Sequence, residues 1–529
     1  MDGVCRAMFA AGEVNLRREN VAGNAASQVR VALWVYALLV ALVTWASWSI
    51  YNRSGDDMTR PLFDKSDQFR DLTNYIGKTA HLYHGAAALG DGIPIFNYPA
   101  PAAFVYKALL YTFPGHAVQT YLVFLASCIL GFSLVAWRAG RATRVVRLSF
   151  AAAIGTTAVL GYPMWFTADR GNIEGVAWTI CAAGLCFLLR AKYSTAAVLI
   201  GLSVCVKPFT VAFLLLLLCR RRYKEATIGL VTVCLVTLTA LIALGPNPWK
   251  AYQSLKPGVH HYLGVYVFNM APVGEERFNH SLLDGMKSAA LTVEMGGIHP
   301  IKALIEVPKL TTKQHGGWRG VHPLVLVLVL VYPFVVITGL GLLFAVFYRM
   351  PMLNQLTALA VATTLFPLSS GEYTLLALYV PFGALLVYLT REVATGKTTF
   401  SYASMLALAA IYALLFSPLT FLSIYAGDAK LLLLLALLIV AARSPMRSAY
   451  FDGPADKMNR NEWVIRELLA PVFPRFMNQE SVAASFSQLR TLSIPSSLLV
   501  AGLHSSNLPA LALSATKNFW SLCRQGRRV

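Results

Sequence analysis

A succession of long apolar segments, separated by short basic stretches, most limits what this chain can fold into. A helix of about 20 apolar residues can cross the ~30 Å hydrocarbon core of a bilayer. Only 13% of the 529 residues are charged and 57% are hydrophobic, which excludes a soluble enzyme, a disordered chain and a nucleic-acid reader. The apolar segments fall at 30–50, 117–137, 148–167, 171–190, 193–206, 208–219, 226–245, 322–348, 352–370, 373–390, 401–423 and 429–442. The sequence therefore predicts an all-α polytopic membrane protein with about 12 transmembrane helices (11–13).

The net charge of +20 is explained by membrane topology, because the basic residues cluster at the ends of the apolar segments. Four of them precede the first segment, which we interpret as an uncleaved signal anchor with a cytoplasmic N-terminus at 1–29. The remaining clusters are Arg138/Arg141/Arg144/Arg147, Arg190/Lys192, Arg220/Arg221/Arg222/Lys224, Arg349, Arg391/Lys397 and Arg443/Arg447. All of them can be cytoplasmic under two conditions. The stretch 193–219 must form a hairpin of two short helices that turns near Lys207-Pro208, and the helix-like stretch 99–113 must not fully cross.

This topology divides the chain into three parts. Residues 30–443 form the predicted transmembrane domain, with external loops at about 51–98 and 246–321. Residues 444–529 form a basic tail that we expect to be cytoplasmic and partly disordered or associated with the membrane surface. The eight cysteines show no CxxC pair and no grouping with histidine, so we expect no disulfide and no metal held by cysteine. We also expect no metal elsewhere and no cofactor.

The first external loop concentrates acidic residues. Within 67–89 a helical pattern places Asp67, Asp71, Asn74 and Lys78 on one face, with apolar residues on the other. Such an amphipathic helix would lie along the outer membrane surface and present two carboxylates at the depth of the lipid headgroups. The alternative is a solvated helix face whose aspartate suits the helix dipole.

A second cluster of polar residues lies between two apolar segments. Asp169, Arg170, Asn172 and Glu174 share one tight turn, and an arginine there could bind a phosphate through paired donors. The alternative is an ion pair of Arg170 with Asp169 or Glu174 that only fixes the turn.

Three further polar residues are candidates for substrate contacts. Lys207 precedes Pro208 between apolar stretches, where a lysine and a helix N-terminus could hold a lipid phosphate; the alternative is a snorkelling lysine. His280 and Glu372 lie in predicted external turns and could contact a sugar or an acceptor. The alternative for both residues is that they are ordinary polar residues of a loop with no role in binding.

The order of these motifs resembles integral-membrane glycosyltransferases of the C-type fold, and most of all glycosyltransferase family 87, the polyprenyl-phosphate-mannose-dependent mannosyltransferases. The similar stretches are Asp71-Leu72-Thr73-Asn74-Tyr75, Tyr98-Pro99-Ala100-Pro101, Gly171-Asn172, Gly201 to Pro208, Asn279-His280-Ser281-Leu282 and Pro367 to Glu372. The likeness extends over about residues 30 to 390. Gly371-Glu372-Tyr373 replaces the family's late histidine motif, and the glutamine of its Gly-Gln-x-Asn turn is absent.

The resemblance implies transfer of a sugar, mannose or another hexose or pentose, from a polyprenyl-phosphate donor to a lipid or glycan acceptor. It places the reaction on the external face of the cell membrane, such as a bacterial inner membrane, with inversion. Asp71 would be the general base, with Asp67 as second choice and Asn74 and Tyr75 in support. Lys207 and Arg170 would offset the charge of the phosphate. A transporter or lipid flippase, and a non-enzymatic assembly subunit, remain the alternatives.

Overall fold

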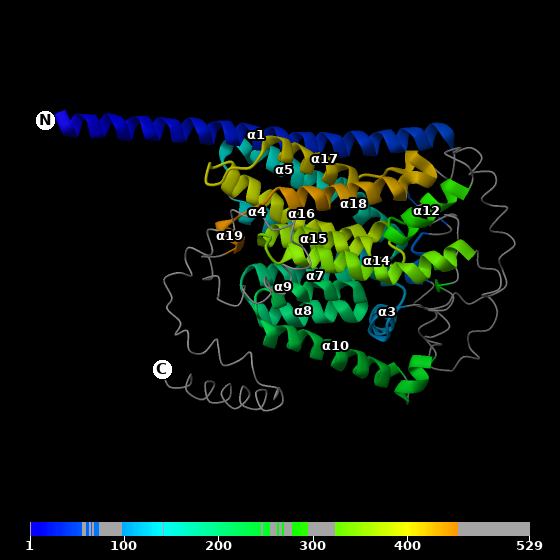
Figure 1. The fold of residues 1–529 in the computed structure, drawn as a ribbon. Coiled ribbons are helices and arrows are strands. Elements are labelled where there is room, and N and C mark those ends of the chain that lie inside the picture. Colours follow the sequence, from blue (N-terminus) through cyan, green and yellow to red (C-terminus); the bar gives the residue numbers. More distant parts are fainter. Residues whose placement is uncertain are drawn as a thin grey trace, which may run out of the picture. The chain divides into compact units, whose positions relative to one another are not determined.

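A computed structural model describes residues 2–55, 60–62, 65, 68–73, 98–140, 142–244, 247–253, 262–263, 267–268, 278–294 and 323–452 of the chain, and over these ranges its elements are helices (Figure 1). The helices up to residue 244 are α1 (Asp2–Ser54), α3 (Ala100–Thr112), α4 (Ala117–Gly140), α5 (Arg144–Leu160), α6 (Tyr162–Arg170), α7 (Glu174–Leu189), α8 (Tyr193–Val206), η3 (Pro208–Leu214), α9 (Leu215–Cys219) and α10 (Tyr223–Leu244). Those that follow are α12 (Leu282–Glu294), α14 (Pro323–Phe347), α15 (Met352–Leu365), η7 (Glu372–Leu378), α16 (Tyr379–Tyr388), η8 (Leu389–Val393), α17 (Tyr402–Leu415), η9 (Thr420–Tyr425), α18 (Ala426–Arg443) and α19 (Ala449–Asp452).

Six helical stretches among the described residues have the length and apolar composition needed to cross a membrane. They are Ala22–Ser54, Ala117–Gly140, Arg144–Arg170, Tyr223–Leu244, Leu324–Phe344 and Glu372–Val393. The predicted all-helical polytopic membrane protein is therefore confirmed. The remaining predicted spans correspond to shorter helices, such as α7 with 16 residues and α8, α15 and α17 with 14 each. The number of about twelve crossings stays a prediction.

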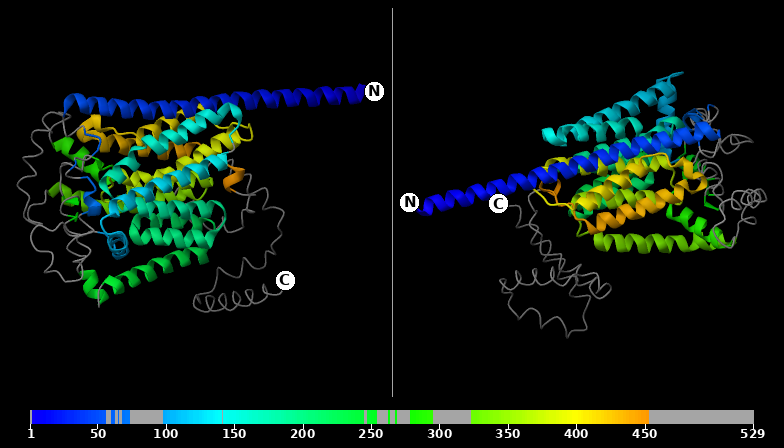
Figure 2. Two further views of the ribbon diagram at one scale, coloured as in Figure 1. Left: turned by 180° about the vertical axis from the view of Figure 1, so that it is seen from behind. Right: turned by 90° about the horizontal axis from the view of Figure 1, so that it is seen from above.

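The helices differ strongly in how much of their surface is buried. The long helices α4, α10 and α14 are only 11%, 17% and 11% buried over their most apolar windows, and they expose large side chains such as Leu130, Leu235 and Phe334. Exposed apolar surface of this extent is what a lipid environment requires. The short helix α15, by contrast, is buried at every residue, because other helices surround it. Figure 2 shows these helices lying side by side.

The observed helix bounds agree with both conditions under which all the basic clusters can lie on the cytoplasmic side. Helix α8 ends at Val206 and η3 begins at Pro208, so the chain turns at Lys207. Helix α3 has 13 residues, and a helix of that length spans about 20 Å, less than the hydrocarbon core. The turns rich in arginine before α8 and α10 lie at the opposite end of the helices from α3 and α12 (Figure 1).

Two predicted features fall wholly or largely outside the described residues. Of the amphipathic helix predicted over 67–89, only 68–73 is described, and 70–73 is helical. The tail prediction concerns 444–529, of which the structure describes 444–452.

Candidate active site

The turn between α6 and α7 forms the base of the candidate site. Helix α6 ends at Arg170 and is followed by Gly171 at φ +67°. The backbone N–H groups of Gly171 and Asn172 donate to the carbonyls of Ala168 and Thr167. This pair of bonds is a Schellman motif, which places a left-handed residue after the helix and favours glycine there. The turn therefore directs Arg170 and Asn172 to the same side.

The segment 68–73 docks onto this turn from the region after α1. The backbone N–H of Phe69 donates to the carbonyl of Asp169 at 2.7 Å, and the Gln68 amide donates to the Asp169 carboxylate at 2.8 Å. Leu72 is fully buried against Gly171, where an added Cβ would lie 2.7 Å from Leu72 Cβ. Two segments a hundred residues apart are thereby fixed to each other.

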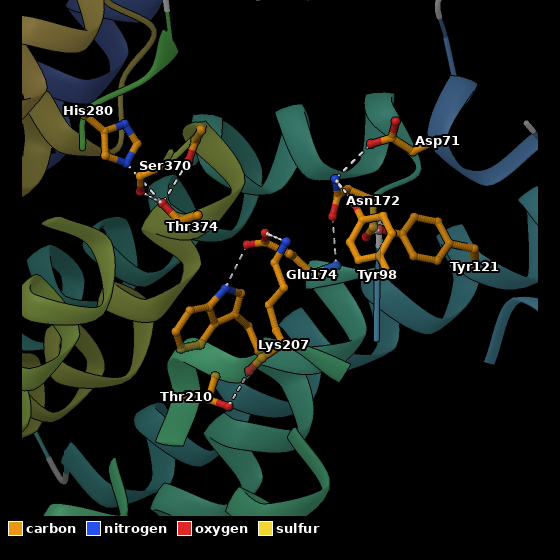
Figure 3. Close-up of polar contacts among 12 residues, drawn as sticks. Asp71, Tyr98, Tyr121, Asn172, Glu174, Lys207, Thr210, His280, Ser370 and Thr374 are labelled. Atoms are coloured by element: carbon orange, nitrogen blue, oxygen red, sulfur yellow. Dashed lines mark hydrogen bonds and ion pairs between the residues drawn. The ribbon is translucent and has the colours of Figure 1, made fainter. Parts of the chain in front are cut away.

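This docking puts Asp71 between a cation and an amide (Figure 3). Arg170 Nε lies 2.9 Å from Asp71 Oδ1, and Asn172 Nδ2 donates to Asp71 Oδ2 at 2.8 Å. The Asp71 residue is 8% exposed. Charge-assisted hydrogen bonds on both oxygens favour the ionised carboxylate and fix its orientation.

Asn172 is oriented by three other groups. Its Oδ1 accepts the backbone N–H of Glu174 at 2.9 Å, which leaves the Nδ2 group as the donor toward Asp71 and, at 3.1 Å, toward the Tyr98 hydroxyl. The hydroxyl of the buried Tyr121 donates to the Asn172 carbonyl. The amide therefore has one orientation that satisfies both its donor and its acceptor.

Lys207 lies beside this group and pairs with Glu174 at the start of α7. Its ammonium is 4.8 Å from the centre of the Tyr98 ring and 5.8 Å from that of Tyr373. Trp178 also donates to the Glu174 carboxylate, at 3.4 Å. Figure 3 shows the Lys207–Glu174 pair between Asp71 on one side and His280 on the other.

A second polar cluster joins the segment before α12 to the turn before η7. His280 Nδ1 lies 3.2 Å from the Phe278 carbonyl, and Nε2 lies 3.0 Å from the Thr374 hydroxyl. Asn279 Oδ1 accepts the backbone N–H of Ser370 at 2.8 Å. Burial, with a smaller contribution from the nearby Lys430 ammonium, lowers the pKa of His280 to about 3, so the imidazole is neutral.

Glu372 belongs to the same turn and forms an ion pair with Lys430 of α18. Both side chains are almost completely buried, and the Lys430 ammonium lies 5.0 Å from the centre of the Tyr162 ring. The pair thereby links α18 to the turn that carries Tyr373. The Glu372 carboxylate, which the sequence analysis considered as a substrate contact, is therefore bound to Lys430.

The structure thus brings four of the predicted residues together: Asp71, Arg170, Asn172 and Lys207. His280 and Glu372 lie in the neighbouring cluster, both buried. Asp67, Asn74 and Tyr75 lie outside the described residues.

Four contributors to the site were missed as such by the sequence analysis. Tyr98 and Tyr373 were quoted only within motifs, Glu174 only as a partner for Arg170, and Lys430 not at all. The apolar run around Lys430 was a usable sign, because a lysine inside such a run needs a buried partner.

The arrangement offers a carboxylate, two cations and aromatic rings at one end of membrane helices. A carboxylate can accept a proton from a hydroxyl, and a lysine can hold a phosphate. The model of glycosyltransferase family 87 matches residues 96–377, just over half of the chain. Of the described residues in the two clusters, only those of the segment 68–73 and Lys430 lie outside this range. No curated protein matches the chain.

Proposed function

Because this chain belongs to glycosyltransferase family 87, we propose that it transfers a sugar from a polyprenyl-phosphate donor to a hydroxyl of a lipid or glycan acceptor, with Asp71 as the general base. The observation that carries the proposal is the position of the Asp71 carboxylate, held between Arg170 and Asn172 beside the Lys207–Glu174 pair. The sugar is mannose or another hexose or pentose.

A carboxylate can accept about four hydrogen bonds, so an acceptor hydroxyl can bind Asp71 beside its contacts with Arg170 and Asn172 or in exchange for one of them. The Asn172 amide is the neutral contact, so its exchange leaves no charge unpaired, whereas loss of Arg170 would. The acceptor oxygen then attacks the anomeric carbon from the side opposite the phosphate, and the configuration inverts. A phosphate leaving group needs little protonation, so one carboxylate is enough, unlike the pair used in glycoside hydrolysis.

Lys207 is the proposed partner of the donor phosphate. Its ammonium carries three N–H donors, so it can keep Glu174 and still donate to a phosphate oxygen. The rings of Tyr98 and Tyr373 flank the ammonium and reduce its contact with water, which strengthens an interaction with an anion. Positive charge beside the leaving phosphate stabilises the charge that develops there.

The external face is the proposed side of the reaction. The arginine-rich turns lie at the opposite end of the helices from the site, and clusters of Lys and Arg favour the cytoplasmic side of a membrane. The two described ion pairs of the site, Arg170–Asp71 and Lys207–Glu174, lie at helix ends and not in the middle of a membrane span. This position favours a reaction at the membrane surface over transport of a substrate across the membrane.

Replacement of Asp71 tests the proposal. Purified Asp71→Asn protein should lose transfer from a polyprenyl-phosphate mannose donor while it still expresses and folds, with a lower unfolding temperature because Arg170 then faces an uncharged amide. An active Asp71→Asn protein together with an inactive Asp67→Asn protein would move the base by one helical turn. Transfer by the wild type in detergent, without vesicles, separates an enzyme from a flippase, and its absence with every donor would reject the function.

A further inference from the structure

A cavity of about 180 Å³ lies among α4, α5, α7 and α16. Its lining is mainly apolar and includes Phe132, Ile154, Leu376 and Phe382. An apolar cavity of about 150 Å³ is large enough to bind benzene, so this cavity can take hydrocarbon. Within helices that cross a membrane, the available hydrocarbon is a lipid chain.

One end of the cavity adjoins the candidate site. Trp178 lines the cavity, and its indole N–H donates to Glu174, the partner of Lys207. Gly175, which follows Glu174 in α7, lines the same end. A chain attached to a phosphate on Lys207 would therefore meet the cavity at its first carbons.

The cavity continues along α7 to the end that carries the basic turns. Arg190, directly after α7, lines this far end. The rise from Gly175 to Arg190 is about 22 Å at 1.5 Å per residue. The cavity thus follows α7 through most of the hydrocarbon depth.

The segment after α18 borders the far end. Tyr450 and Phe451 of α19 line the cavity there, and Phe451 is 7% exposed. Glu392 holds this segment, since its Oε1 accepts the Ser448 hydroxyl at 2.8 Å and the backbone N–H of Tyr450 at 3.0 Å. The Arg391 guanidinium lies 4.1 Å from the centre of the Tyr450 ring. This segment lies outside residues 96–377, the range that the family model matches.

We propose that this cavity binds the isoprenoid chain of the donor and that Phe451, held by the Glu392 contacts, limits the length of chain that fits. The proposal rests on the proposed function, because it takes the phosphate of the donor to lie at Lys207. The chain of the donor is favoured over that of an acceptor lipid, since the cavity adjoins the cation proposed for the donor phosphate and not Asp71.

Gly383 gives a direct test. It lines the middle of the cavity on α16, and a Cβ added there meets no atom within 4 Å, so Gly383→Leu places a side chain in the cavity without a contact at Cβ. Gly155 of α5 is equally open but does not line the cavity, which makes Gly155→Leu the matched control. Transfer is measured with one donor of two isoprene units and one of full natural length. We expect Gly383→Leu to lower kcat/KM about tenfold or more for the long donor only, and Gly155→Leu to lower neither.

Phe451→Ala is the second variant and opens the far end, so it should shift the preferred donor toward longer chains. Equal chain-length profiles for the wild type, Gly383→Leu and Phe451→Ala would overturn the proposal while leaving the proposed function intact. A loss that follows the chain length of the acceptor instead of the donor would also overturn it. If Gly383→Leu fails to fold, Phe451→Ala decides alone.

Discussion

Arg170, the last residue of α6, is 2.9 Å from the carboxylate of Asp71 through its Nε atom, and both side chains are nearly buried. A cation at a helix C-terminus is favoured by the helix dipole, and here it also compensates a carboxylate that has little water around it. The guanidinium of Arg170 therefore contributes both to the charge balance and to the orientation of Asp71.

Arg170→Lys tests this dependence, because lysine keeps the charge but lacks the planar group whose Nε faces Asp71. We expect kcat/KM for sugar transfer to fall about tenfold or more, which corresponds to about 1.4 kcal/mol of transition-state stabilisation. Arg144→Lys, at the exposed first position of α5, is the control and should keep wild-type activity. Wild-type activity in Arg170→Lys would mean that only the charge matters.

Gly171→Ala should weaken the docking of the Asp71 segment. Alanine at φ +67° costs about 1–2 kcal/mol from the backbone alone, and the new Cβ would also meet Leu72 Cβ at 2.7 Å. Gly115→Ala has a similar φ of +76° with open space around it, so it measures the backbone cost alone. We expect Gly171→Ala to lower the unfolding temperature more than Gly115→Ala and, unlike it, to reduce transfer.

The sequence predicted the parts of this arrangement that depend on local pattern. Apolar segments indicated the helices, and Pro208 with Lys207 indicated the turn between α8 and η3. Hydropathy did not reveal the breaks inside apolar segments. The predicted segment 401–423 contains two elements in the structure: α17, which ends at Leu415, and η9, which begins at Thr420.

The partners of the charged residues were not predictable in the same way. Local spacing offered Asp169 and Glu174 for Arg170, whereas the structure pairs Arg170 with Asp71. Glu174 pairs instead with Lys207. Periodicity describes one element at a time, and these pairs form only when separate helices pack.

The Glu372–Lys430 pair should dominate the stability of the neighbouring cluster. Removing one partner of a buried pair leaves an uncompensated charge, so Lys430→Met should cost about 3–5 kcal/mol in the free energy of unfolding. The double variant Glu372→Gln with Lys430→Met removes both charges and should regain most of that loss. Unfolding curves of the two single variants and the double variant give the coupling between the two residues directly. Additive effects would show that the pair contributes nothing as a pair.

His280 should make the protein less stable in mild acid. Burial, and to a smaller extent Lys430, lowers the pKa of His280 from 6.5 to about 3 in the folded protein, so between these values the unfolded chain binds more protons. Stability therefore rises with pH across this window, is complete above about pH 6.5, and is about 2 kcal/mol lower at about pH 5 than at about pH 7.5 because of this one group.

The measurement compares the free energy of unfolding at these two pH values for the wild type and for His280→Gln, whose amide does not titrate. The variant is expected to lose about 2 kcal/mol of the difference between the two conditions, whatever its stability at neutral pH. His116→Gln, at an exposed histidine before α4, should keep the wild-type difference. If His280→Gln also keeps it, the imidazole gains its proton in the folded protein, and the buried contacts to Thr374 and the Phe278 carbonyl do not hold it neutral.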